Sequence, residues 1–166
     1  MESPSARDSH FLHKIGHFLY LYGGKSSPEE TAYGDMWRLD VQNAQWDGNK
    51  QDVSGCVWES LDIQTPGPLA SFGSALVGRD IFLHGGFNSR HELNSDLWRF
   101  GSENESWEKI DTMGKAPKAR HSHTLTLLEG DKGYKKVLVV FGGLTDKKVG
   151  DYHPSNEVFL LDLENF

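Results

Sequence analysis

Three short apolar runs organise the hydrophobic pattern of this chain, and each run ends in two consecutive glycines. The runs cover residues 18–22, 81–84 and 137–141, and they are rich in aliphatic and aromatic side chains. Continuous apolar runs of this length are typical of strands that are buried on both faces. The glycine pairs that follow are Gly23-Gly24, Gly85-Gly86 and Gly142-Gly143. Because these pairs are 62 and 57 residues apart, they indicate an internal repeat.

An alternating pattern follows each glycine pair after a polar segment. Apolar side chains occupy every second position, which predicts a strand with one buried face. These side chains are Trp37 and Leu39, Trp98 and Phe100, and Phe159 and Leu161. A second tryptophan, Trp58 or Trp107, opens a further strand in the first two units. Since no window of ten or more residues has a helical period, four short strands per unit predict an all-β repeat.

The repeat predicts a single domain over residues 1–166, because a chain of this length normally forms one domain. Its units are expected at approximately residues 4–66, 67–115 and 116–166. The segments between strands are polar and contain glycine, so they are predicted to be surface loops. These segments are residues 25–34, 43–55, 87–95, 129–136 and 144–155.

A third recurring feature opens each unit. The first unit opens with Pro4-x-x-Arg7-x-x-His10 and the third with Pro117-x-x-Arg120-x-x-His123. The middle copy is expected at Pro68-x-x-Ser71-x-x-Ser74, which places Ser71 where the other two units have arginine.

The order of these features resembles the kelch repeat over nearly the whole chain. That resemblance implies a β-propeller, in which each unit is a four-stranded blade around a central channel. It also implies that the glycine pairs are structural and turn the chain beside the neighbouring blade. The tryptophans Trp37, Trp58, Trp98 and Trp107 would be structural as well, packing between blades.

The third unit departs from the kelch pattern because it is incomplete. Phe166 lies seven residues after Phe159, whereas Trp107 lies nine residues after Trp98, so the outer strand is not reached. Kelch propellers generally have about five to seven blades, and an open arc of three would expose apolar faces. Two interpretations stay open: the chain is a piece of a longer propeller, or a second copy or another chain closes the ring.

The charge, hydropathy and cysteine content of the chain indicate which partners and which cellular compartments to expect. The net charge of −7 disfavours nucleic acid, which is bound through clustered Lys and Arg. No stretch approaches the length of a transmembrane helix, and the N-terminus lacks the features of a secretory signal. The single cysteine, Cys56, fits a reducing compartment. We therefore expect a cytoplasmic location, or a nuclear one, and no contact with a membrane or nucleic acid.

Candidate catalytic chemistry is sparse in the sequence. The eight histidines show no convincing zinc-ligand spacing, and neither a phosphate-binding loop nor a nucleophile elbow is present. We expect no metal and no cofactor. The rival interpretation is a kelch-propeller enzyme, such as a sugar-acid isomerase, whose catalytic residues lie outside this segment.

The resemblance to kelch substrate receptors implies a non-catalytic interaction module that binds another protein or peptide at the channel mouth. The corresponding residues are Arg7, Arg120, Ser71, Lys25, Phe87 and Leu144. A guanidinium suits carboxylates or phosphates, but Arg7 and Arg120 could instead pair with carboxylates or carbonyls of their own blades. If Arg120 binds a partner, Arg120→Ala should weaken binding without lowering thermal stability; equal loss of both would indicate a structural role.

Overall fold

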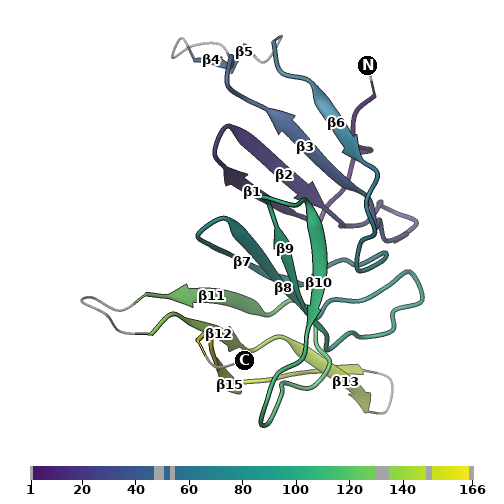
Figure 1. Cartoon of the computed structure of the whole chain (residues 1–166). Coiled ribbons are helices and arrows are strands. Elements are labelled where there is room, and N and C mark those ends of the chain that lie inside the picture. The colour runs from purple at the N-terminus through teal and green to yellow at the C-terminus, as the bar shows by residue number, and fades with distance from the viewer. Residues whose placement is uncertain (1, 47–50, 53–54, 130–134, 149–150, 165–166) are drawn as a thin grey trace.

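The computed structural model describes residues 2–46, 51–52, 55–129, 135–148 and 151–164, and this part of the chain contains strands but no helix. Three antiparallel sheets follow one another from the top to the bottom of Figure 1. The predicted all-β fold with about three blades is confirmed. No helix among the described residues is long and apolar enough to cross a membrane.

The first two blades each have four strands, as the repeat predicts. The first has the order β1-β2-β3-β6 and the second the order β7-β8-β9-β10. Their strands are β1 (Phe11–Ile15), β2 (Phe18–Tyr22), β3 (Met36–Asp40), β6 (Trp58–Leu61), β7 (Gly73–Val77), β8 (Asp80–His84), β9 (Leu97–Gly101) and β10 (Ser106–Ile110). The continuous apolar runs form β2 and β8, which have a neighbouring strand on each side.

The third blade is a three-stranded sheet of β11 (Thr124–Leu128), β12 (Val137–Phe141) and β15 (Val158–Asp162), in the order β11-β12-β15. The prediction of an incomplete last blade is therefore confirmed for the described residues. β15 is the counterpart of β3 and β9, and it lies at the sheet edge.

Two segments predicted as loops contain short hairpins instead. Residues 144–155 include β13 (Leu144–Lys148) and β14 (Asp151–Pro154), and the insertion 43–55 includes β4 (Gln45–Trp46) and β5 (Gln51–Asp52). The loop prediction was wrong there because backbone pairing in a hairpin does not require an apolar side-chain pattern. The loop predictions for residues 47–50, 53–54 and 130–134 lie outside the described residues.

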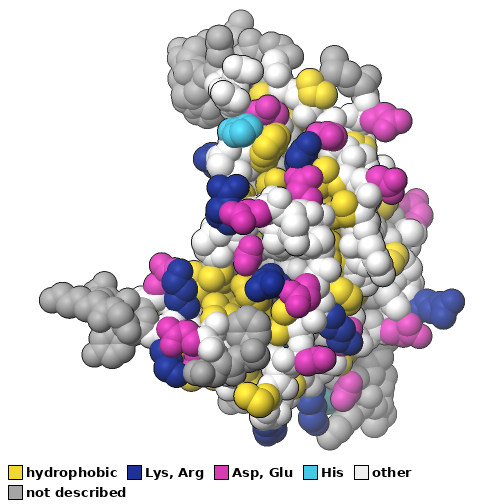
Figure 2. Space-filling view, in the orientation of Figure 1, with side chains coloured by type: hydrophobic (Ala, Val, Ile, Leu, Met, Phe, Trp, Pro, Cys, Tyr) yellow, Lys and Arg dark blue, Asp and Glu magenta, His cyan; other side chains and the backbone are white. Residues whose placement is uncertain are grey.

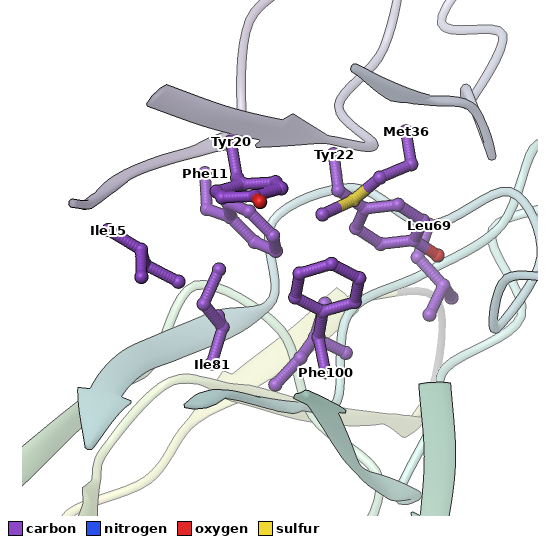
Figure 3. Packing of buried hydrophobic residues seen from close by; sticks show 9 residues of the cluster. Phe11, Ile15, Tyr20, Tyr22, Met36, Leu69, Ile81 and Phe100 are labelled. Carbon is purple, nitrogen blue, oxygen red and sulfur yellow. The ribbon is translucent and has the colours of Figure 1, made fainter. Parts of the chain in front are cut away.

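Aromatic and aliphatic side chains fill the interface between the first two blades. Figure 3 shows Tyr20, Tyr22 and Met36 facing Ile81 and Phe100 across this interface. The outer strand contributes as well: the Trp107 ring of β10 lies 5.1 Å from the Tyr22 ring and 5.4 Å from the Phe100 ring, measured between centroids. Burial of such large apolar surfaces is the main stabilising contribution in a blade stack.

The face that each blade presents to the next one is covered in the first two blades and open in the third. Met36 and Leu97, at equivalent positions of β3 and β9, are 0% and 8% exposed, whereas Val158 of β15 is 58% exposed. Tyr22 at the end of β2 is fully buried, but its counterpart Phe141 at the end of β12 is 50% exposed. The predicted open apolar face is therefore located on the last blade.

Candidate functional site

The three residues that follow the glycine pairs occupy equivalent positions at one end of the blades. Lys25 forms a β-bridge with Asp8, Phe87 with Ala70, and Leu144 with His121. Each bridge joins the segment after a glycine pair to the segment just before an inner strand. The repeat therefore brings Lys25, Phe87 and Leu144 to the same end of successive blades, as expected from the sequence.

A chain of backbone hydrogen bonds connects the blades at this end. The N–H of Ser71 donates to the carbonyl of Ser9 at 3.1 Å, and the N–H of Ser122 donates to the carbonyl of Ser71 at 2.7 Å. All three serines have positive φ, between 54° and 58°. This conformation is uncommon for residues other than glycine, and its recurrence shows that the three serines are structurally equivalent.

This equivalence corrects the predicted alignment of the middle blade. Ser71 corresponds to Ser9 and Ser122, and the position of Arg7 and Arg120 is taken by Leu69. Leu69 is 4% exposed and packs in the core between the first two blades. The sequence offers two prolines two residues apart, Pro66 and Pro68, and the alignment started from the wrong one.

The two arginines of the repeated motif are engaged within their own blades. Arg7 makes two hydrogen bonds to the Asp35 carboxylate, at 2.6 and 2.8 Å, and another to the carbonyl of Gly23 at 3.1 Å. Burial tends to raise the pKa of Asp35, but hydrogen bonds from Arg7 and Trp37 outweigh it and hold that pKa below its usual value. These hydrogen bonds of Arg7 thus connect the start of the first blade to its glycine pair and to the residue before its third strand.

Arg120 repeats the arrangement in the third blade. It donates to the carbonyl of Gly142 at 2.8 Å, to the Glu157 carboxylate at 2.9 Å and to the carbonyl of Lys118 at 3.1 Å. Its side chain is fully buried. This geometry favours the structural interpretation of both arginines over direct contact with a partner. In the middle blade, which has Leu69, the equivalent carboxylate of Asp96 pairs with Lys109 at 2.8 Å.

A hollow of about 430 Å³ lies between the post-glycine segments of the three blades. Three of the predicted binding residues line it, namely Lys25, Ser71 and Phe87. The other lining residues are Glu30, His91, His121, Ser122 and Tyr152. Arg7, Arg120 and Leu144 do not line it, although Leu144 is hydrogen-bonded through its backbone to His121.

The floor of the hollow is aromatic. The Phe87 ring stacks on His91 at 5.4 Å and meets the His121 ring edge-on at 5.1 Å. The Tyr152 ring also meets His121 edge-on, at 4.8 Å. Phe87 is held in place by packing with Ala32, Ala70 and Leu93, so this aromatic surface has a rigid support.

Polar groups surround the aromatic floor. Lys25 pairs with Glu30, and this hydrogen bond lowers the pKa of the Glu30 carboxyl. His121 is 8% exposed; its Nδ1 lies 3.0 Å from the Ser122 hydroxyl, while its Nε2 has no hydrogen-bond partner. Burial, followed by the charges of His91 and Lys25, lowers the pKa of His121. His121 therefore contributes a neutral ring to the wall of the hollow, and its Nε2 is buried behind that surface.

Five residues that line the hollow were not among the six binding residues predicted from the sequence. His121 and Ser122 lie inside the repeated motif directly after Arg120, and their position in that motif could have identified them. Glu30, His91 and Tyr152 lie in segments predicted as loops, and no sequence signal shows that these loops meet.

Two histidines, His84 and His123, form a buried pair between the second and third blades. His84 Nδ1 lies 3.0 Å from His123 Nε2, and the two rings meet edge-on. Burial, and next the charge of Arg120, lowers the pKa of His84 to about 4, while burial and the neighbouring His84 lower that of His123 to about 3. Neither imidazole is therefore protonated near neutral pH.

We expect this histidine pair to make stability depend on pH. In the unfolded chain both histidines titrate near 6.5, so below that pH the unfolded state binds more protons and stability falls as the pH drops toward 4. Urea unfolding at about pH 7.5 and about pH 5 should show a lower midpoint at the acidic pH. The double substitution His84→Phe/His123→Phe, which uses the residue types of the equivalent positions Phe141 and Phe72, should flatten this dependence. Equal slopes in both proteins would contradict the assignment.

No group of three or more His, Cys, Asp or Glu side chains in the described ranges is arranged to hold a metal ion. The rings of His84 and His123 meet edge-on, with their centroids 5.0 Å apart.

The stacked four-stranded sheets, their glycine turns and their shared end define this chain as part of a β-propeller. A family model described as the KLHDC2/KLHL20/DRC7 Kelch-repeats domain matches residues 1–166. The chain belongs to the Kelch-repeat family. A solved structure titled "Structure of YjhT" aligns with a TM-score of 0.59 at 21% identity, covering 87% of this chain and 36% of that one.

The relatives of this chain carry different names. Kelch domain-containing protein 3 of Homo sapiens is 27% identical over 152 residues, which cover 90% of this chain and 37% of that protein. The N-(sulfonatooxy)prop-2-enimidothioate sulfolyase of Thlaspi arvense is 28% identical over 145 residues, covering 86% and 37% of the two chains. The chain spans 37% or less of the length of these relatives.

Proposed function

We propose that this chain is a non-catalytic interaction module that binds a peptide segment of another protein in the hollow at the channel mouth, in the cytoplasm or nucleus. The observation that carries the proposal is the convergence of Lys25, Ser71 and Phe87 from two blades on one hollow with an aromatic floor. Concave, largely apolar surfaces with a few convergent polar groups are the usual form of a binding site.

The chemistry of the hollow suits an extended peptide. Its aromatic rings can pack against an apolar side chain, while Lys25 and the serine hydroxyls can bond to peptide groups. In this version the arginines Arg7 and Arg120 hold the blades in place rather than touch the ligand. The alternative, that the chain is part of a kelch-propeller enzyme, stays a prediction. One relative is named as a sulfolyase, but that name describes the relative and not this chain.

Selection from a random peptide display library would test the proposal. We expect the chain to enrich related sequences and to bind a selected peptide in solution. Lys25→Ala/His91→Ala should weaken that binding by at least about tenfold, because both side chains border the hollow. The matched control is Lys14→Ala/His17→Ala, which removes the same residue types from exposed positions of the first blade. No enrichment, or equal loss in both variants, would refute the proposal.

A further inference from the structure

Two post-glycine loops hold a residue in an unusual backbone conformation beside the hollow. A backbone hydrogen bond closes each loop, at 3.0 Å to the carbonyl of Thr31 in the first blade and at 3.2 Å to the carbonyl of Glu92 in the second. Glu30 and His91 directly precede these two residues, and their φ angles are 54° and 58°. Positive φ is uncommon for residues other than glycine, so its recurrence shows that Glu30 and His91 occupy equivalent positions in their loops.

The side chains of Glu30 and His91 meet at the hollow. Glu30 Oε2 lies 3.4 Å from His91 Nε2, and Glu30 Oε1 accepts a hydrogen bond from Lys25. Among the described residues, Glu30 is the only carboxylate that lines the hollow. Because a carboxylate has about four acceptor sites, these two contacts leave Glu30 able to accept hydrogen bonds from a ligand.

Two carboxylates share the single ammonium group of Lys25. Glu30 pairs with it directly, and Asp8 lies opposite Lys25 in a β-bridge. The hydrogen bond to Glu30, and then the charges of Glu30 and Asp8, raise the pKa of Lys25. A cationic ligand would balance the charge of this group, whereas an anionic ligand would increase its excess of negative charge.

Solvent exposure also favours contact with the carboxylate. The Glu30 side chain is 45% exposed, whereas that of Lys25 is 17% exposed. A ligand that enters the hollow therefore reaches Glu30 more readily than it reaches the ammonium group of Lys25.

The accessible part of the aromatic floor consists of His91 and Tyr152. Phe87 and His121 are buried, whereas His91 is exposed and Tyr152 is half-buried. The hydroxyl of Tyr152 donates to the carbonyl of His91 at 3.5 Å, so the two residues are neighbours. A guanidinium stacks on aromatic faces and binds a carboxylate through two parallel N–H groups, which the ammonium of a lysine cannot do.

The charge of the whole chain acts in the same direction. The net charge is −7, and Figure 2 shows Asp and Glu side chains over the visible face, interspersed with Lys and Arg. The field of an acidic protein attracts basic segments and speeds their association.

We propose that the hollow selects a peptide segment that carries an arginine, whose guanidinium pairs with Glu30 and stacks on the rings of His91 and Tyr152. This inference rests on the proposed function, because it specifies the chemistry of the peptide that the hollow binds. Lys25 is a positioning residue in this arrangement, since its hydrogen bond keeps the Glu30 carboxylate at the hollow. That role agrees with the loss of binding expected for Lys25→Ala/His91→Ala.

Selection from the random peptide library with charge-reversed variants tests the inference. We expect the unmodified chain to enrich peptides with arginine at one fixed position. Glu30→Lys should enrich Asp or Glu at that position instead, because the selecting charge is inverted. The matched control is Glu29→Lys, which makes the same change of charge at the neighbouring exposed residue and should keep the arginine preference.

Fluorescence anisotropy with one selected peptide gives the magnitude. Replacement of its arginine by citrulline, which keeps the shape and loses the charge, should weaken binding to the unmodified chain by at least about tenfold. The same replacement should weaken binding to Glu30→Gln by less than about twofold, because the partner charge is already absent. A lysine in place of the arginine should bind more weakly than arginine and more tightly than citrulline.

The outcomes separate this inference from the proposed function. Enrichment of peptides without arginine, or an equal loss with citrulline in the unmodified chain and in Glu30→Gln, would overturn the inference and leave the peptide site standing. Enrichment of acidic residues by the unmodified chain would also overturn it and would assign the selection to Lys25. Failure to enrich any peptide would refute the proposed function and the inference together.

Discussion

Arg120→Ala should lower the free energy of unfolding by about 2–4 kcal/mol. The substitution leaves a cavity at a fully buried position and removes the donors that satisfy the carbonyls of Gly142 and Lys118. Glu157 is 44% exposed, so water can solvate its carboxylate, and the loss of the ion pair adds little. Urea unfolding followed by tryptophan fluorescence would measure the change.

Arg99→Ala is the matched control for Arg120→Ala. Arg99 is 38% exposed and pairs with a more exposed partner, Glu108, so its removal should cost less than about 1 kcal/mol. If Arg120→Ala left the unfolding midpoint unchanged and abolished peptide binding instead, the arginine would be a binding residue, which is one of the two roles that the sequence left open.

Gly85→Ala should be among the most damaging single substitutions in this chain, costing more than about 3 kcal/mol. Gly85 has a φ of +72°, and an added Cβ would lie 2.5 Å from the carbonyl oxygen of Arg120 and 2.8 Å from the His123 ring. The second blade would have to move away from the third to relieve these overlaps, and overlaps of this kind are costly in a packed core. The thermal unfolding midpoint would report the effect.

Gly78→Ala separates backbone strain from steric overlap. Gly78 has a similar φ of +62°, but a Cβ there would meet nothing within 4 Å. Gly78→Ala should lower the free energy of unfolding by only about 1–2 kcal/mol, the cost of the left-handed backbone conformation for a residue with a Cβ. Similar losses in the two variants would mean that blade contact at Gly85 contributes little.

The residue pattern was enough to predict the blade architecture, but it predicted only some of the residues that line the hollow. The runs that became β2, β8 and β12, the alternating strands β3, β9 and β15, and the glycine pairs depend on local periodicity and local backbone preference. Both properties are encoded in a few consecutive residues. Lys25 and Phe87 were found because a repeat places the same position of each unit at the same end of its blade.

Other features depended on contacts between segments that are distant in sequence. Whether Arg7 and Arg120 face a ligand or their own blades depends on where Asp35 and Glu157 lie. The register of the middle blade was decided by backbone hydrogen bonds between Ser9, Ser71 and Ser122.

The amino-acid pattern sufficed for the repeat, its strands and its incomplete third unit, because each of these depends on neighbours in the chain. The hollow around His121, the buried pair of His84 and His123, and the contact between Glu30 and His91 were visible only in the folded structure. Their side chains come from different blades, and their distances are set by how the blades stack, which no local pattern encodes.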